Sequence, residues 1–113
     1  MEKYDLYING RWEKPSSGAY FESDNPYDGE IWAKIARGNE KDVDFAVTAA
    51  RSAFEDHWEP MKPTERGKIL VRLAELIERE ATRLGEIEVK DNGKLFAEMG
   101  AQTKYLAEWY RYF

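Results

Sequence analysis

The sequence contains no cysteine among its 113 residues. This absence excludes disulfide bonds, cysteine-ligated zinc and a cysteine nucleophile within the chain. No stretch approaches the roughly 20 apolar residues of a membrane-spanning helix, and the first residues lack the apolar core of a signal peptide. We therefore expect a soluble, cytoplasmic protein with no membrane partner.

The sequence also lacks any run of Lys or Arg, and its net charge is -5. An acidic surface repels phosphates, so nucleic acid is not an expected partner. Hydrophobic residues make up 42% of the chain and aromatic residues 14%, which is compatible with a packed core and argues against disorder. At this length the composition favours one domain.

Few residues in the chain carry a recognisable catalytic pattern. His57 is the only histidine, and no nucleophile is paired with it in the sequence, so we interpret it as a surface or capping residue. Carboxylates such as Glu75 and Glu78 fall on polar helix faces and are typical of solvated charges. HExxH, Walker A and GxGxxG patterns are absent. The motifs alone predict no catalytic and no cofactor-binding residue.

Residues 1–38 have the alternating pattern of short strands, interrupted by turn residues. Leu6 and Ile8 alternate with polar or amphipathic neighbours, and Asn9-Gly10 supplies the two positive-φ positions of a type I′ hairpin turn. Further short strands are expected at residues 19–22 and 30–36, separated by turn residues. This region predicts a small antiparallel sheet of two to three short strands, which is rarely stable alone.

Residues 39–113 have the spacing of three amphipathic helices. Asn39 is a favourable N-cap for the first helix and Thr64 for the second. Asn92-Gly93 predicts the end of the second helix, inside which Gly85 predicts a kink. The expected apolar stripes are Val43, Ala46, Val47, Ala50, Ala53 and Phe54 in the first helix; Leu70, Leu73, Ala74, Ile77, Ala81 and Leu84, flanked by Ile69 and Leu76, in the second; and Leu95, Met99, Gln102, Leu106, Trp109, Tyr110 and Phe113 in the third.

The last helix has no Gly, Asn or Pro stop signal after it, and Phe113 lies on its apolar side. An α-helix leaves its last carbonyls unpaired, and a finished domain usually caps or solvates them. The pattern therefore favours a chain that is cut off, and we expect an α+β fragment rather than a complete domain.

Six segments occur in an order that is more specific than any single motif. They are residues 7–12 (YINGRW), 25–30 (NPYDGE), 42–54 (DVDFAVTAARSAF), 65–70 (ERGKIL), 73–79 (LAELIER) and 91–94 (DNGK). In this order they resemble the amino-terminal region of the NAD(P)-dependent aldehyde dehydrogenases, and the aromatic residues 111–113 resemble the end of the family's third helix. The chain departs from the family pattern at Leu95, where a proline is usual, and this change should loosen the helix start slightly.

The resemblance implies a parent enzyme that is several times longer, with an α/β architecture and a Rossmann-like cofactor domain. Such enzymes oxidise an aldehyde to a carboxylic acid with NAD or NADP, using a cysteine thiolate and a glutamate that activates water. In the family these residues lie downstream of the position that matches Phe113. Residues 1–113 would then be an incomplete part of the cofactor-binding domain, inactive alone and without a bound cofactor.

Two candidate sites are implied by the resemblance alone. Many family members hold a structural monovalent cation at positions that match Ser23, Asp24 and Asp91, although Asp91 is equally well explained by turn capping. The third helix of the family borders the aldehyde entrance, and Ala101 and Tyr105 match that position. For Tyr105, packing in a core is the interpretation that we favour over a place at the entrance.

Two hypotheses follow for the role of the chain. In the first it is an amino-terminal fragment whose partner is the remainder of an aldehyde dehydrogenase chain, and its uncovered apolar stripes cause self-association. In the second it is a standalone, non-catalytic helical interaction module of the same ancestry. The apolar side of Trp109, Tyr110 and Phe113 would then be the partner surface.

Overall fold

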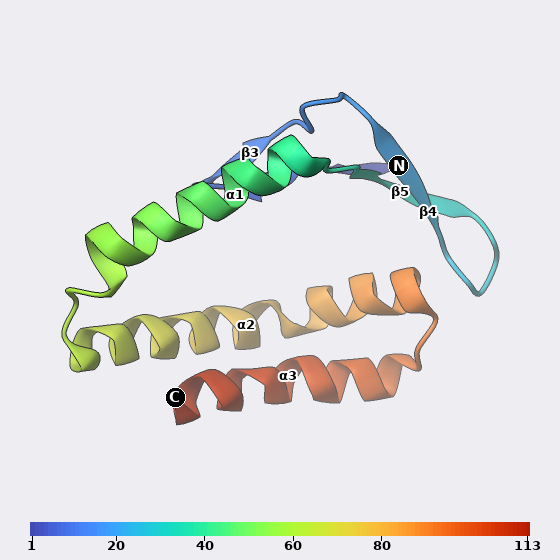
Figure 1. The fold of residues 1–113 in the computed structure, drawn as a ribbon. Helices are drawn as coiled ribbons and strands as arrows, with labels where there is room; N and C mark the ends of the chain where they lie inside the picture. Colours follow the sequence, from blue (N-terminus) through green and yellow to red (C-terminus); the bar gives the residue numbers. More distant parts are fainter. The chain divides into compact units, whose positions relative to one another are not determined.

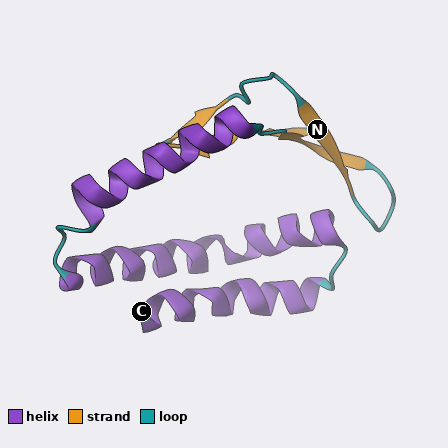
Figure 2. Cartoon of the chain, viewed as in Figure 1, coloured by secondary structure: helices purple, strands orange, loops and turns teal.

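The computed structural model describes residues 1–113, which divide into two compact units. Unit 1 consists of Met1–Asp24 and Glu30–Pro60, and unit 2 consists of Asn25–Gly29 and Met61–Phe113. All strands precede the first helix along the chain (Figure 2). From the sequence we expected a strand region at residues 1–38 and a helical region at residues 39–113. The compact units are divided elsewhere, because the first helix is grouped with the strands in unit 1.

Unit 1 contains five short strands and one helix (Figure 1): β1 (Glu2–Tyr4), β2 (Leu6–Ile8), β3 (Arg11–Glu13), β4 (Tyr20–Asp24), β5 (Ile31–Ala36) and α1 (Glu40–Ala53), which continues into the π-helical turn η1 (Phe54–Trp58). Strands β1, β5 and β4 form one sheet in that order, and β2 pairs with β3 in a second. The α+β class and the small sheet are confirmed. Strand β1 was not predicted, and it adds a parallel pairing with β5 to the antiparallel pairs.

The hairpin of β2 and β3 closes at the predicted turn. Asn9 has a φ of 54° and Gly10 a φ of 77°, and Ile8 pairs with Arg11 across the two-residue loop. Two positive φ values match the right-handed twist of the strands, as a type I′ turn requires. Cross-strand partners Tyr7 and Trp12 make an edge-to-face contact with ring centroids 5.1 Å apart.

Helix α1 begins at the predicted cap with a reciprocal pair of hydrogen bonds. The Asp42 backbone N–H donates to the Asn39 side chain at 3.2 Å, and the Asn39 backbone N–H donates to Asp42 Oδ2 at 3.0 Å. The backbone N–H of Ser16 donates to the other oxygen of Asp42 at 3.0 Å. This capping box satisfies orphan donors of the helix terminus and ties the loop after β3 to it.

Unit 2 is a hairpin of two long helices, α2 (Pro63–Asn92) and α3 (Phe96–Tyr112). The predicted N-cap Thr64 is wrong, because Lys62 occupies the cap position and Pro63 the first helical position, for which its fixed φ is suited. The predicted stop is confirmed, since Gly93 adopts the left-handed conformation and its N–H donates to Val89. No helix in either unit has the length and apolar character needed to cross a membrane.

Small side chains bring α2 and α3 together. The buried residues are Ala74, Ala81 and Gly85 on α2 and Met99 and Ala107 on α3. A Cβ atom added at Gly85 would lie 3.5 Å from the backbone N of Gly100, so Gly85 marks a close approach of the two helices inside an unbroken α2. The Thr103 hydroxyl lies 3.0 Å from the Ala81 carbonyl oxygen and can donate to it across the interface.

The predicted apolar side of the third helix is only partly correct. Met99 is buried and Tyr110 is half-buried, as expected. Leu106, Trp109 and Phe113 are instead 41%, 57% and 79% exposed. Ala107 and Thr103 face the closely packed helix together with Met99, while these three large side chains remain exposed.

Candidate functional site

Both residues expected at a substrate entrance lie on the uncovered side of α3. Ala101 and Tyr105 are four positions apart, so they occupy the same helix face one turn from each other. Together with Gln102, Leu106 and Trp109 they line an open groove of about 560 Å³. The structure thus brings the two predicted residues into one surface.

The groove is mainly aromatic and aliphatic, with few polar groups. The rings of Tyr105 and Trp109 meet edge to face with centroids 6.3 Å apart. Tyr105 is 62% exposed, so the favoured interpretation of Tyr105 as a core residue is wrong for this chain. The side chains of the groove that can form hydrogen bonds are the Gln102 amide, the Tyr105 hydroxyl and the Trp109 indole N–H. Such a surface can hold an apolar molecule or an apolar chain segment, but it offers no positioned acid–base pair.

The three residues expected at a cation site come from different parts of the chain. Ser23 and Asp24 end β4 in unit 1, whereas Asp91 is the penultimate residue of α2 in unit 2. No group of three or more His, Cys, Asp or Glu side chains is arranged to hold a metal ion. The register of β4 on β5 shifts between Ser23 and Asp24, which leaves Trp32 without a Cα partner on β4. The residue skipped by this shift is on β5 and is neither Ser23 nor Asp24. A hard cation favours oxygen ligands, so the residue types fit and the site stays a prediction.

His57 lies in an exposed groove of about 320 Å³ on unit 1, whose lining also includes Ser52 and Asp56. The structure contains no hydrogen bond that joins His57 to either of them. Nucleophilic catalysis requires a base within hydrogen-bond reach of its nucleophile and a third group that orients the base. The groove therefore brings together suitable residue types without the required geometry.

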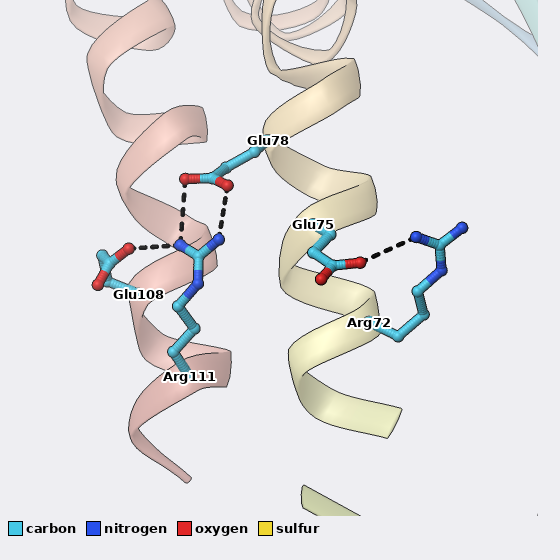
Figure 3. Close-up of polar contacts among 5 residues, drawn as sticks. All are labelled: Arg72, Glu75, Glu78, Glu108 and Arg111. Atoms are coloured by element: carbon cyan, nitrogen blue, oxygen red, sulfur yellow. Dashed lines mark hydrogen bonds and ion pairs between the residues drawn. The ribbon is translucent and has the colours of Figure 1, made fainter. Parts of the chain in front are cut away.

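The shifted pKa values belong to structural hydrogen bonds rather than to a catalytic centre. The hydrogen bond from Arg111 holds the pKa of Glu78 below its ordinary value, and those from Arg83 and Arg79 do the same for Glu80. Figure 3 shows Glu78 and Glu108 converging on Arg111, which joins α3 to α2.

A third groove, on α2, was not predicted from the sequence. It has a volume of about 530 Å³ and is lined by Met61, Glu65, Lys68, Ile69, Arg72, Leu73 and Leu76. Ile69 and Leu76 flank the predicted apolar stripe of this helix. Apolar residues beside the stripe were the sequence feature that could have indicated a second apolar surface. Helix α2 is thus apolar on more than the face that packs on α3.

The sequence model of the aldehyde dehydrogenase family matches residues 12–113. Over 114 aligned residues the chain is 44% identical to (Z)-2-((N-methylformamido)methylene)-5-hydroxybutyrolactone dehydrogenase of Acinetobacter baylyi, with all of this chain and 23% of that protein covered. A solved NAD-dependent aldehyde dehydrogenase from Sinorhizobium meliloti matches 97% of the chain at a TM-score of 0.93 and 28% identity, over 22% of its own length. An aldehyde dehydrogenase structure from Bacillus cereus matches 97% of the chain at 0.91 and 36% identity, over 23% of its length.

The order of the strands and helices, the match to the family model and the similarity to these relatives all indicate the same family. The chain belongs to the aldehyde dehydrogenase family and corresponds to its amino-terminal region. It spans less than a quarter of the length of these relatives.

Proposed function

We propose that the chain is the amino-terminal part of an NAD(P)-dependent aldehyde dehydrogenase, and that it has no catalytic activity alone. The observation that carries the proposal is the family match over residues 12–113 in a chain that spans 23% of a relative's length. The absence of cysteine supports the second half, because the family's nucleophile is a cysteine thiolate. In the parent enzyme the residues 1–113 contribute scaffold to the cofactor-binding domain, in the cytoplasm.

The partner of this chain is the remainder of the enzyme, and without it the chain self-associates. Two independently folded domains of half its mass would together expose about 7700 Å², whereas this chain exposes 8564 Å². If the two units were treated as separate bodies, the exposed area of this chain could only be larger. The excess includes large apolar side chains, among them Val47, Trp109 and Phe113. Exposed apolar surface of this kind supports association.

Each candidate site has a place in this proposal. Ala101 and Tyr105 border the path of the aldehyde in the parent enzyme, and their shared groove supports that role. Ser23, Asp24 and Asp91 supply oxygens to a structural monovalent cation. NAD or NADP is held by residues outside this chain, so neither cofactor binds to residues 1–113 alone.

The experiment has a genetic and a biochemical arm. The DNA that follows the codon for Phe113 should continue in frame and encode a cysteine and a glutamate in the family's spacing; an immediate stop codon in the native gene would contradict the fragment proposal. The purified chain, shown by circular dichroism to be helical, should produce no NADH or NADPH from a panel of aldehydes. Turnover that a substitution in this chain abolishes would disprove its inactivity.

The exposed aromatics on α3 also favour the alternative of an interaction module. A pull-down that recovers one stoichiometric partner, lost on Trp109→Ala, would support the module instead. Under the fragment proposal the same bait should recover no partner of fixed stoichiometry other than itself.

A further inference from the structure

Helix α2 has two apolar sides, and only one of them is covered within its unit. Ala74, Ala81 and Gly85 pack on α3. About half a helical turn away, the α2 groove runs along residues 61–76 and is open to solvent. Ile69 is 46% and Leu73 37% exposed in this groove. About the first four turns of α2 therefore present an uncovered apolar surface.

The lining of the α2 groove is divided into two parallel flanks. Ile69, Leu73 and Leu76 recur at spacings of four and three, which places them along one apolar flank. Glu65, Lys68 and Arg72 recur at spacings of three and four and form a charged flank beside it. Each flank continues over about two turns of the helix.

We propose that the α2 groove is occupied by the α2 groove of a second copy of this chain, in an antiparallel two-fold arrangement. The inference rests on the proposed self-association and assigns its surface. A two-fold axis perpendicular to the plane of two antiparallel helices keeps each flank on the same side, so the apolar flank meets its own copy. We align residues 62–75 of the two copies antiparallel, with residue 62 of one copy opposite residue 75 of the other. Glu65 of one copy then lies opposite Arg72 of the other, and the symmetry forms this pair twice. The same alignment sets Lys62 opposite Glu75.

The charges of this flank are free to exchange partners. Lys68 pairs with Glu65 at 2.8 Å, within the exposed surface of α2. Arg72 pairs with Glu75 at 2.9 Å on the same helix (Figure 3). Surface pairs of this kind contribute little to stability, so they can be exchanged at small cost. The groove on α3 that contains Ala101 and Tyr105, here called the α3 groove, has no charged side chain in its lining. Arg111 near the end of the same helix is held by two hydrogen bonds to Glu78. Complementary, exchangeable charges therefore favour the α2 groove over the α3 groove as the self-association surface.

The first test compares matched leucine variants of the whole chain by sedimentation velocity over a concentration series. Leu73→Asp buries a charge in the proposed interface and should weaken the dimer about tenfold or more. The control is Leu106→Asp on α3, because Leu106 is 41% exposed against 37% for Leu73. It should leave the dissociation constant within about threefold of the unmodified chain, the usual spread of surface changes.

The second test exchanges the paired charges. Glu65→Arg and Arg72→Glu should each weaken the dimer several-fold, because each opposes like charges twice across the axis. The double variant restores the opposite signs and should recover most of the affinity. A loss that the double variant fails to recover would contradict the proposed register.

The third test uses the absence of cysteine, since any disulfide must come from an introduced residue. Ile69 lies next to the proposed axis, where two Cα atoms come close enough for a disulfide. Under mild oxidation Ile69→Cys should form covalent dimers at least about tenfold faster than Leu106→Cys, as expected for a positioned thiol pair. Equal rates would overturn the assignment. A dimer dissociated by Leu106→Asp alone would overturn it while leaving self-association intact, whereas a monomeric unmodified chain would contradict both.

Discussion

Arg111 near the end of α3 forms a bidentate ion pair with Glu78 on α2 through both terminal nitrogens of its guanidinium group. Nη1 donates to Oε1 at 3.1 Å and Nη2 donates to Oε2 at 2.5 Å, between residues 33 positions apart in the sequence (Figure 3). Glu108 accepts a further hydrogen bond from Nη1 at 2.5 Å. Bidentate pairing of this kind fixes geometry as well as charge, so Arg111 anchors the last turn of α3 to α2.

Replacing Glu78 with glutamine should therefore loosen the α3 end more than the loss of an ordinary surface charge. We expect Glu78→Gln to lower the midpoint of urea unfolding and to increase hydrogen exchange in the last turns of α3. Glu80→Gln is the matched control, because Glu80 pairs only with Arg79 and Arg83 on its own helix. An equal response of α3 to both substitutions would show that the cross-helix pair does not anchor it.

Asn39 should be the most sensitive polar residue at the start of α1. Asn39→Ala removes the acceptor of the Asp42 N–H and should cost about 1 kcal/mol of helix stability. Asn39→Ser keeps a capping oxygen and should cost much less. Hydrogen exchange at the Asp42 amide is the measurement, and equal exchange rates in the two variants would contradict the capping role.

Acid should weaken the same helix terminus through Asp42. The hydrogen bond from the Asn39 backbone, followed by that from Ser16, holds the pKa of Asp42 below its ordinary 3.8. Because the folded pKa is the lower one, the stabilisation is complete above pH 3.8 and is lost as the pH falls through the folded pKa. The measurement is the helical circular dichroism signal as the pH is lowered, and Asp42→Asn should make the acidic part of this curve less steep. Other carboxylates such as Glu78 also contribute to the curve. An unchanged acidic part of the curve would exclude Asp42 as a major contributor.

Tyr20 should be the last tyrosine of the chain to ionise. Its hydroxyl donates to Asp5 at 2.5 Å, and this hydrogen bond raises the pKa of Tyr20 to about 12. A raised folded pKa means that the stabilisation is present below pH 10.0 and is lost as the pH rises through about 12. Ultraviolet titration should show one late phase that Asp5→Asn moves to lower pH. A late phase that survives this substitution would have to come from another tyrosine.

The local signals of the sequence predicted much of the fold. Asn9-Gly10, Asn39 and Gly93 act as predicted because turns and caps depend on a few neighbouring residues. Strand β1 was missed, since a three-residue polar segment becomes a strand only through pairing with residues of β5 that lie 31 positions away. Local signals also failed for part of the packing side of α3, where Ala107 is buried together with Met99 while Leu106, Trp109 and Phe113 are exposed.

The candidate site could be predicted only through family resemblance. Ala101 and Tyr105 form no motif, and the structure adds that they share one groove. The α2 groove escaped prediction because a single apolar stripe was expected for each helix, whereas α2 has two. Which stripe is covered depends on tertiary partners, and periodicity alone contains no information about them.

Two glycines of unit 2 should respond to alanine in opposite directions. Gly93 has a φ of 72°, and a Cβ atom there would lie 3.1 Å from Pro26 Cβ, so Gly93→Ala should destabilise the chain by about 1–2 kcal/mol. Gly85 is helical and a Cβ atom would meet its neighbours at 3.5 Å, an ordinary contact distance. Gly85→Ala should therefore stabilise α2 by up to about 1 kcal/mol, the usual difference in helix propensity.

Gly67→Ala is the control, because a Cβ atom at Gly67 meets nothing within 4 Å and reports propensity alone. A smaller gain at Gly85 than at Gly67, measured by urea unfolding, would mean that the helix–helix contact has no room for a methyl group. Gly85→Val should be destabilising in either case, because its two γ carbons have to enter the space against Met99 and Thr103. A stable valine variant would show that α2 and α3 separate easily and that Gly85 does not limit their approach.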